Sequence, residues 1–315
     1  MGGVRLAGFV GTRYRWQIQP RFFVILAILA GVIASIWGLT ALVGVLTRPK
    51  PPELPGGGRV IFPDYRLFGY SGYPGAGALG RLGTGDIDAR LDEIVASGAD
   101  YAGDRKVMPV MELIATMVHA TPGDDGLYRT RVADDVIASW LETARKHKAM
   151  LLLNIQPGRS AMFDEVRYYE KWLVNPDVGL ALDPEWAVGP DEVPGKVFGH
   201  TTGQELDAIA GWVSELVAAN NLPEKVVLYH QLHEDIVTDE DLLQPAEGVV
   251  VIKSVDGIGT PTAKTGLYYR IASRTPEHVH LGFKLFFEED ARHGPLMTPA
   301  EVMDLSPEPE YVLWE

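Results

Sequence analysis

Residues 149–155 read AMLLLNI, residues 178–182 read VGLAL, and residues 163–174 between them read FDEVRYYEKWLV. The two short runs are almost continuously apolar, which is typical of strands that are buried on both faces of a parallel sheet. The segment between them mixes apolar and charged residues at helical spacing. Together the three segments predict a strand–helix–strand unit.

The same unit recurs along most of the chain. Short apolar runs occupy residues 66–70, 107–113, 149–155, 178–182, 225–230, 248–255, 279–287 and 311–315. Segments that predict helices occupy residues 86–97, 132–147, 163–174, 203–220 and 298–305. Eight strands with intervening helices predict an α/β fold of the (β/α)8 TIM-type barrel class. An open, doubly wound sheet is the alternative, although the one GxGxxG match, at 75–80, lacks the acidic residue that usually follows such a turn.

The N-terminal part of the chain has a different character. Residues 22–47 contain no charged side chain, and about 20 apolar residues suffice to cross a bilayer as a helix. Arginines precede this segment without any acid, so we expect residues 1–21 to stay in the cytoplasm and the C-terminal domain to lie outside it. A cleaved signal peptide is the rival interpretation, but its apolar core is usually only about 7–15 residues long. The segment also contains small residues that could pack against a partner helix in the membrane.

A proline- and glycine-rich segment follows at residues 48–58, and it predicts a short stalk before a barrel domain at 59–315. The first 50 residues carry a charge of +6, so the remainder must carry −20 to give the total of −14. Such an acidic domain argues against nucleic acid as a partner. The chain has no cysteine, which excludes disulfides, thiol catalysis and thiolate metal ligands.

Active sites of such barrels lie at the C-terminal ends of the strands. Polar and aromatic residues that the sequence places at these ends are the candidates for substrate binding: Tyr70, Glu112, Gln156, Trp186, His230, Lys253 and Trp314. Carboxylates can exchange protons with a glycosidic bond, and aromatic rings can stack on sugar rings. The mixture therefore indicates a polysaccharide or glycan as the partner.

The strongest catalytic signal is VGLALDPEW at residues 178–186. Alternate residues of an extended segment point the same way, so Asp183 and Glu185 are expected to face the barrel centre together. Two neighbouring carboxyl groups do not ionise independently, and the one whose pKa rises can serve as a general acid.

This Asp-x-Glu strand end resembles that of chitinase-like glycoside hydrolases, and the final YVLWE resembles their eighth strand. The resemblance implies that Glu185 is the proton donor, that Asp183 orients the acid or the substrate, and that Trp314 forms the floor of a sugar subsite. The sequence departs from the family pattern at Ala181, where that pattern has a further Asp.

Retaining glycosidase barrels often carry their nucleophile at the end of the seventh strand, which makes Glu288 or Glu289 the candidate. A metal site at His230, His233 and Asp235 is the alternative for the fifth strand end. The sequence has no HExxH motif, however, and we expect neither a metal nor another cofactor.

These observations predict a membrane-anchored extracytoplasmic glycoside hydrolase that acts on cell-envelope or extracellular polysaccharide. The alternative is a non-catalytic barrel of the same fold that binds glycan or an envelope protein.

Overall fold

The computed structural model describes residue 21, residues 27–35, residue 37 and residues 50–315, and the chain divides into two compact units, 1–50 and 51–315. Residues 27–35 are helical and exposed. Among the described residues, no helix combines the length and the apolar character needed to span a bilayer. Nearly all of the predicted tail at 1–21 and most of the predicted transmembrane helix at 22–47 lie outside the described residues.

Residues 51–315 form a closed, TIM-type barrel of eight parallel strands, which confirms the predicted fold. The barrel strands are β1 (Tyr65–Gly72), β2 (Lys106–Val118), β4 (Met150–Ile155), β5 (Val178–Leu182), β7 (Lys225–Gln231), β9 (Val249–Val255), β10 (His280–Leu285) and β11 (Tyr311–Trp314). Neighbours pair in this order, and β11 returns to β1 to close the barrel. Strand β3 (Arg129–Arg131) pairs antiparallel with the far end of β2, and β6 (Thr201–Thr202) pairs with β8 (Val237–Thr238) in a small separate sheet.

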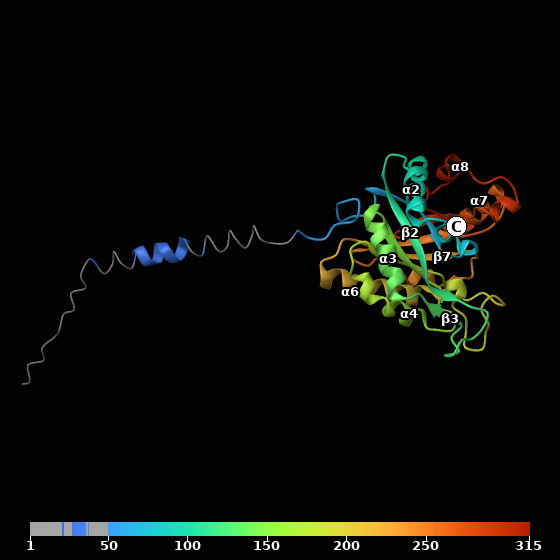
Figure 1. Ribbon diagram of the computed structural model, residues 1–315, viewed down its shortest axis with the longest axis horizontal. Helices are drawn as coiled ribbons and strands as arrows, with labels where there is room; N and C mark the ends of the chain where they lie inside the picture. Colours follow the sequence, from blue (N-terminus) through green and yellow to red (C-terminus); the bar gives the residue numbers. More distant parts are fainter. Residues whose placement is uncertain (1–20, 22–26, 36, 38–49) are drawn as a thin grey trace, which may run out of the picture. The chain divides into compact units, whose positions relative to one another are not determined.

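Helices surround the strands, as Figure 1 shows for α2, α3 and α6. The α-helices of the barrel unit are α2 (Ile87–Gly98), α3 (Asp134–Lys146), α4 (Met162–Tyr168), α5 (Glu170–Leu173), α6 (Gly203–Asn220), α7 (Pro261–Ala272) and α8 (Pro299–Met303). Short 3-10 turns are η1 (Gly77–Leu79), η2 (Arg81–Gly83), η3 (Ala99–Tyr101), η4 (Pro184–Trp186), η5 (Glu240–Leu242) and η6 (Asp290–Arg292).

Two helices differ from the prediction for physical reasons. The segment 163–174 is divided at Tyr169, whose buried hydroxyl donates to the Ala115 carbonyl and also lies 2.8 Å from the Thr116 hydroxyl. Helix α7 was missed because its buried face contains Lys264, which hides the apolar stripe that would reveal it.

The barrel has two cores, which follow from the alternation of side chains along each strand. The interior core contains every second residue, for example Met150 and Leu152 of β4. The residues between them, such as Leu151 and Leu153, pack outward in the layer between strands and helices. Each strand therefore needs apolar residues on both faces, which explains the nearly continuous apolar runs in the sequence.

Part of the expected stalk is packed on the barrel. Leu54 is only 3% exposed and joins the interior core with Ile61 and Tyr65. The Tyr65 hydroxyl donates to the Gly57 carbonyl at 2.8 Å. From Leu54 onward, the segment therefore covers the N-terminal end of the barrel. The apolar side chain of Leu54 and the turn after it give this segment a packed conformation that its prolines and glycines did not indicate.

Candidate active site

The polar residues of the site continue the inward-facing alternation of the strands. On β4, Met150 and Leu152 face the interior, and Asn154 is the next inward position. The same step of two residues leads from the interior core to the C-terminal end of every barrel strand. The resulting ring of polar side chains consists of Ser71, Glu112, Asn154, Asp183, His230, Asp256, Lys284 and Glu315.

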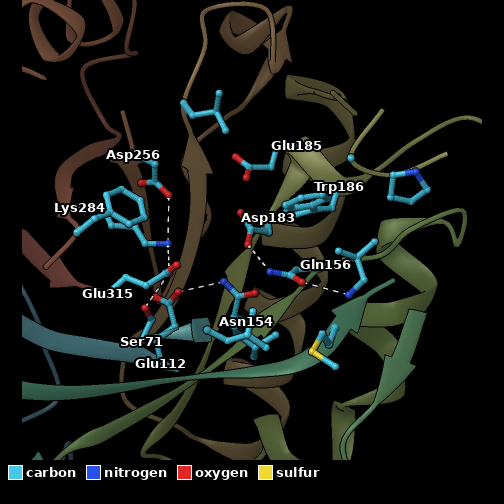
Figure 2. Close-up of a pocket in the computed structure, with 18 of the residues that line it drawn as sticks. Ser71, Glu112, Asn154, Gln156, Asp183, Glu185, Trp186, Asp256, Lys284 and Glu315 are labelled. Atoms are coloured by element: carbon cyan, nitrogen blue, oxygen red, sulfur yellow. Dashed lines mark hydrogen bonds and ion pairs between the residues drawn. The ribbon is translucent and has the colours of Figure 1, made fainter. Parts of the chain in front are cut away.

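This ring forms the base of a cavity of about 490 Å³. Charged groups gather on one side, where Glu112, Asp256, Lys284 and Glu315 lie together (Figure 2). The other side is more apolar, because the C-terminal end of β2, the turn η4 and the loop after it contribute Met117, Val118, Trp186, Pro194 and Gly195. Glu185 and Asp183 lie between the two sides (Figure 2). A ligand in this cavity would therefore contact an apolar surface on one side and a charged surface on the other, with Asp183 and Glu185 between them.

Glu112, His230 and Asp256 form a buried ion network at the base. The His230 ring places Nε2 2.9 Å from Glu112 Oε1 and Nδ1 2.6 Å from Asp256 Oδ2. Burial alone would lower the pKa of His230, but the two carboxylates raise it well above its usual value. Burial likewise opposes ionisation of Glu112 and Asp256, yet His230 keeps the pKa of each below its usual value. The imidazolium and both carboxylates are therefore charged at neutral pH.

Further hydrogen bonds hold Glu112 in place. Asn154 Nδ2 donates to its Oε1 at 3.0 Å, and the Tyr311 hydroxyl donates to its Oε2 at 3.1 Å. Since four groups from four strands meet here, the network fixes the ends of β2, β4, β7 and β11 relative to one another. Glu112 is completely buried.

Lys284 neutralises the opposite side of the ring. Its Nζ lies 2.7 Å from Glu315 Oε2 and 3.7 Å from Asp256 Oδ2. Burial would lower the pKa of Lys284, but Glu315 and Asp256 raise it well above the usual value. Ser71 Oγ also donates to Glu315 Oε2 at 3.0 Å. The lysine is thus a permanent cation that is shared by two carboxylates.

Asp183 and Glu185 have the opposite electrostatic character. Strand β5 ends at Leu182, and Pro184, two residues later, begins the turn η4, which carries Glu185 over the cavity. Burial, followed by the charges of Asp183 and Asp256, raises the pKa of Glu185 from 4.5 to about 9. Burial also raises the pKa of Asp183, whose Oδ2 accepts a hydrogen bond from Gln156 Nε2 at 3.2 Å. Glu185 Oε2 is buried without a hydrogen-bond partner among the described residues. Glu185 is therefore a neutral acid at neutral pH, and it can still offer a proton.

The protonation of Glu185 makes stability depend on pH. The folded protein keeps a proton that the unfolded chain releases above about pH 4.5, so this group's contribution to stability falls as the pH rises toward about 9. Glu185→Gln removes that titration. We expect the free energy of unfolding of the variant to match that of the wild type at about pH 5. Between about pH 5 and about pH 8, it should rise relative to the wild type by up to about 1.4 kcal/mol per pH unit. Urea unfolding at both pH values measures this difference, and a pH-independent difference would contradict the assignment.

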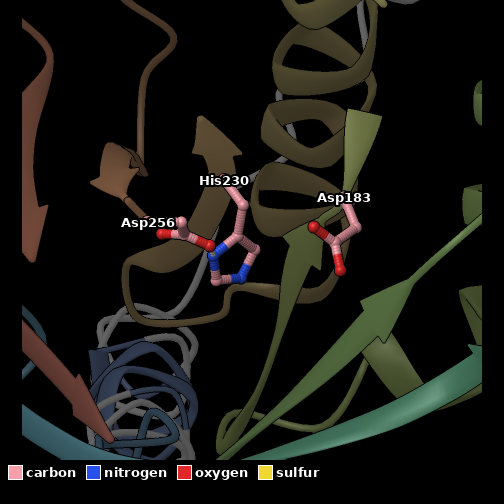
Figure 3. A group of neighbouring side chains, drawn as sticks. All are labelled: Asp183, His230 and Asp256. Carbon is pink, nitrogen blue, oxygen red and sulfur yellow. Dashed lines mark ion pairs between the residues drawn. The ribbon is translucent and has the colours of Figure 1, made fainter. Parts of the chain in front are cut away.

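Asp183, His230 and Asp256 place potential ligand atoms within 4.8 Å of one another, as a metal site requires (Figure 3). Their surroundings do not suit a metal ion. Both ring nitrogens of His230 face carboxylates, at 2.9 Å and 2.6 Å, and a metal would have to displace one of these contacts to reach a nitrogen lone pair. The nearby Lys284 ammonium would also repel a cation. His233 and Asp235, the other members of the metal alternative, have largely exposed side chains.

The structure brings together five of the residues that the sequence singled out. Lining the cavity are Glu112, Gln156, Asp183, Glu185 and Trp186. His230 lies behind the lining as the completely buried centre of the ion network.

Three of the predicted substrate-binding residues lie elsewhere, for one common reason. Tyr70, Lys253 and Trp314 occupy outward positions of their strands and belong to the layer beneath the helices. Tyr70 packs edge-on against Phe287, Lys253 pairs with Glu240 at 2.6 Å, and Trp314 stacks on Phe287 with a centroid distance of 4.5 Å. The predicted aromatic floor at Trp314 therefore does not line the cavity.

Glu288 and Glu289 also lie outside the cavity lining. Their side chains are 78% and 39% exposed, and both interact with Arg292. They follow Phe287, beyond the end of β10. The inward position of β10 is occupied instead by Lys284.

Asp256, Lys284 and Glu315 are site residues that sequence reasoning did not select. Each lies two residues after an inward position of its strand: Ser254, Gly282 and Leu313. Counting by two from the centre of each strand would have identified them. Polarity at the strand ends alone did not, because it cannot separate inward from outward positions.

No family model and no curated protein matches the chain. Among solved structures, a hyperthermophilic endo-β-1,4-glucanase in complex with substrate is similar at 8% identity and a TM-score of 0.37, over 74% of this chain and 82% of that chain. A structure described as AsfvAP:AG is similar at 14% identity and a TM-score of 0.23, over 70% of this chain and 60% of that chain. The function is therefore inferred from the geometry of the site itself.

Proposed function

We propose that this protein is a glycoside hydrolase with Glu185 as its general acid. The observation that carries the proposal is the separation of pKa values in one cavity: that of Glu185 is raised to about 9, whereas that of Asp256 is lowered. Paired acids whose environments push their pKa values apart are the usual arrangement for acid–base catalysis. The apolar surface that includes Trp186 supplies a face on which a sugar ring can lie.

In the proposed reaction, Glu185 donates its proton to the glycosidic oxygen as the bond from that oxygen to the anomeric carbon breaks. A water molecule then bonds to the anomeric carbon and gives up a proton, which restores Glu185. The Asp256 carboxylate stabilises the positive charge that develops on the sugar. Asp183, which is bound by Gln156, orients the acid or the substrate from the same strand end.

The test is the release of reducing ends from a panel of envelope and extracellular polysaccharides by the full-length protein. Cleavage by the wild type and its loss in Glu185→Gln would support the proposal. A panel without any cleavage, together with retained binding, would favour the second candidate below.

The second candidate is a glycan-binding barrel without catalysis. One observation favours it: both ionised carboxylates with lowered pKa, Glu112 and Asp256, are already occupied by His230 and further hydrogen bonds. A carboxylate held in this way is a weak nucleophile. Binding without turnover would then be the only activity of the cavity.

The location remains a proposal that rests on residues 22–47. We propose that this segment anchors the protein in the cell membrane, with the N-terminus in the cytoplasm and the barrel outside it. The arginine-rich flank and the uncharged stretch support it. Protease treatment of intact cells tests it, because an external barrel would be digested and an internal one would be protected.

A further inference from the structure

The charges that line the cavity are unequal. Five carboxyl side chains line it, and Lys284 is the only lysine or arginine among the described lining residues. Lys284 is already engaged by Glu315 and Asp256. His230 is a second cation of the ring, between Glu112 and Asp256, and Glu185 is neutral, so the acceptors without an ion-pair partner among the described residues lie toward Asn154 and Asp183 (Figure 2).

Asn154 provides an independent observation on that side. The residue is 2% exposed and lines the cavity, yet its Oδ1 has no hydrogen-bond partner among the described residues. The orientation of the amide is set, because Nδ2 donates to the ionised Glu112 at 3.0 Å. A buried acceptor without a partner costs free energy, and a ligand that brings a donor would recover it.

Asn154 and Asp183 lie at the ends of two adjacent strands of the barrel, β4 and β5. Asn154 pairs in register with Ala181 of β5, and Asp183 is the next inward residue of that strand. The side chains thus form adjacent members of the polar ring, with Glu185 above them. Both residues line the cavity, and Asp183 uses one of its oxygens to accept from Gln156.

We propose that the cavity recognises a sugar that carries a free, protonated amine, and that Asn154 Oδ1 and the Asp183 carboxylate receive the ammonium group. This inference rests on the proposed function, since it names the substrate class of the same site. An ammonium group has three donors and no acceptor, which matches acceptors on Asn154 and Asp183. An N-acetylated amine has lost the charge and keeps one donor, and a uronic acid would add a further negative charge to the acidic ring.

The proposal also accounts for the raised pKa of Glu185. A positive charge beside Asp183 and Glu185 lowers the pKa of both carboxyl groups. For Glu185 the shift runs from about 9 toward neutrality, where a general acid transfers its proton more readily. The free protein would hold the proton tightly, and the cationic substrate would itself activate the acid.

The test compares the affinity of the full-length Glu185→Gln protein, purified in a mild detergent, for oligosaccharides of equal length. The Gln side chain matches the neutral form of Glu185 and prevents turnover. The probes are oligomers of glucosamine, N-acetylglucosamine, glucose and galacturonic acid, measured by calorimetry below the pKa of the sugar amine. We expect glucosamine oligomers to bind at least about tenfold tighter than the other three, and we expect added salt to weaken that binding.

A second variant locates the subsite. Asn154→Leu, added to Glu185→Gln, is expected to remove most of the preference for glucosamine, whereas Glu215→Gln, which removes an exposed charge on α6, is expected to keep it. Equal affinity for amino and neutral oligomers, or tighter binding of the galacturonic acid oligomer, would overturn the proposal. If Asn154→Leu fails to fold, the relative affinities of the Glu185→Gln protein for the four oligosaccharides still test the proposal.

The two proposals fail in different ways. Preferential binding of glucosamine oligomers without cleavage of any polysaccharide by the wild type would retain the amine site and reject the hydrolase. Cleavage of neutral polysaccharide without a preference for amines would retain the hydrolase and reject the amine site.

Discussion

Replacing Glu185 by Gln is expected to lower the kcat for polysaccharide hydrolysis by about 10²–10⁴-fold, the usual contribution of a positioned general acid. The variant keeps the size and the neutral state of the side chain, but its amide cannot give up a proton. Because Glu185 is protonated in the resting site, KM is expected to change little. Initial rates of reducing-end release over a range of substrate concentrations separate the two constants.

The pH profile sharpens this prediction. The activity of the wild type is expected to decline on the alkaline side as Glu185 loses its proton, with the limit at about 9 in the free protein. Any residual activity of Glu185→Gln should lack that limit. Glu215→Gln serves as the matched control, since Glu215 is exposed on α6, far from the strand ends that carry the site. Wild-type kcat in Glu185→Gln would refute the assignment of the acid.

Replacing Lys284 by Met is expected to lower the free energy of unfolding by about 3–5 kcal/mol, the usual cost of removing one partner from a buried ion pair. The side chain of Lys284 is 8% exposed, and its loss would leave Glu315 and Asp256 without their shared cation. Chemical denaturation with urea at neutral pH measures the change. Lys146→Met is the control, because Lys146 pairs with Asp88 on the surface, where a salt bridge contributes little.

The cost of Lys284→Met should also depend on pH. Lys284 helps to hold the pKa of Asp256 below its usual value, so its stabilising effect is present above the unfolded pKa of that carboxyl and is lost as the pH falls through the folded pKa. The difference between variant and wild type should therefore shrink in acid. A loss no larger than that of Lys146→Met at neutral pH would show that the network does not depend on this cation.

Much of the fold can be predicted from single stretches of sequence. The eight apolar runs correspond to the eight barrel strands, because a strand that is buried on both faces needs apolar side chains at nearly every position. The Thr298 cap of α8 follows from its local sequence and forms the expected reciprocal hydrogen bonds with Glu301. The sequence did not predict helix α7, because its buried face includes the charged residue Lys264. Lys264 forms a buried ion pair with Asp290, which is distant in the sequence, so no local pattern reveals that the lysine is buried.

The site was predicted only in part. Asp183 and Glu185 were found because the polar pair directly follows an apolar strand, and both line the cavity. Tyr70 and Trp314 are equally close to strand ends, but their outward positions turn them toward the helices. Side chains along a strand alternate between its two faces. A position one residue earlier or later therefore places a side chain beneath the helices instead of in the cavity.

The order of apolar runs and helices in this chain was enough to predict eight buried parallel strands, because burial on both faces of a strand is a property of each segment alone. Only the tertiary structure shows that these strands close into a barrel, where β11 pairs with β1, rather than form an open sheet. The chemistry of the barrel mouth was not specified in this way. His230 becomes an imidazolium, and Asp256 becomes a stabilised anion, because closure of the barrel brings β2, β7, β9 and β10 together around them. The raised pKa of Glu185 has the same origin, since burial and the approach of Asp183 and Asp256 exist only in the closed barrel.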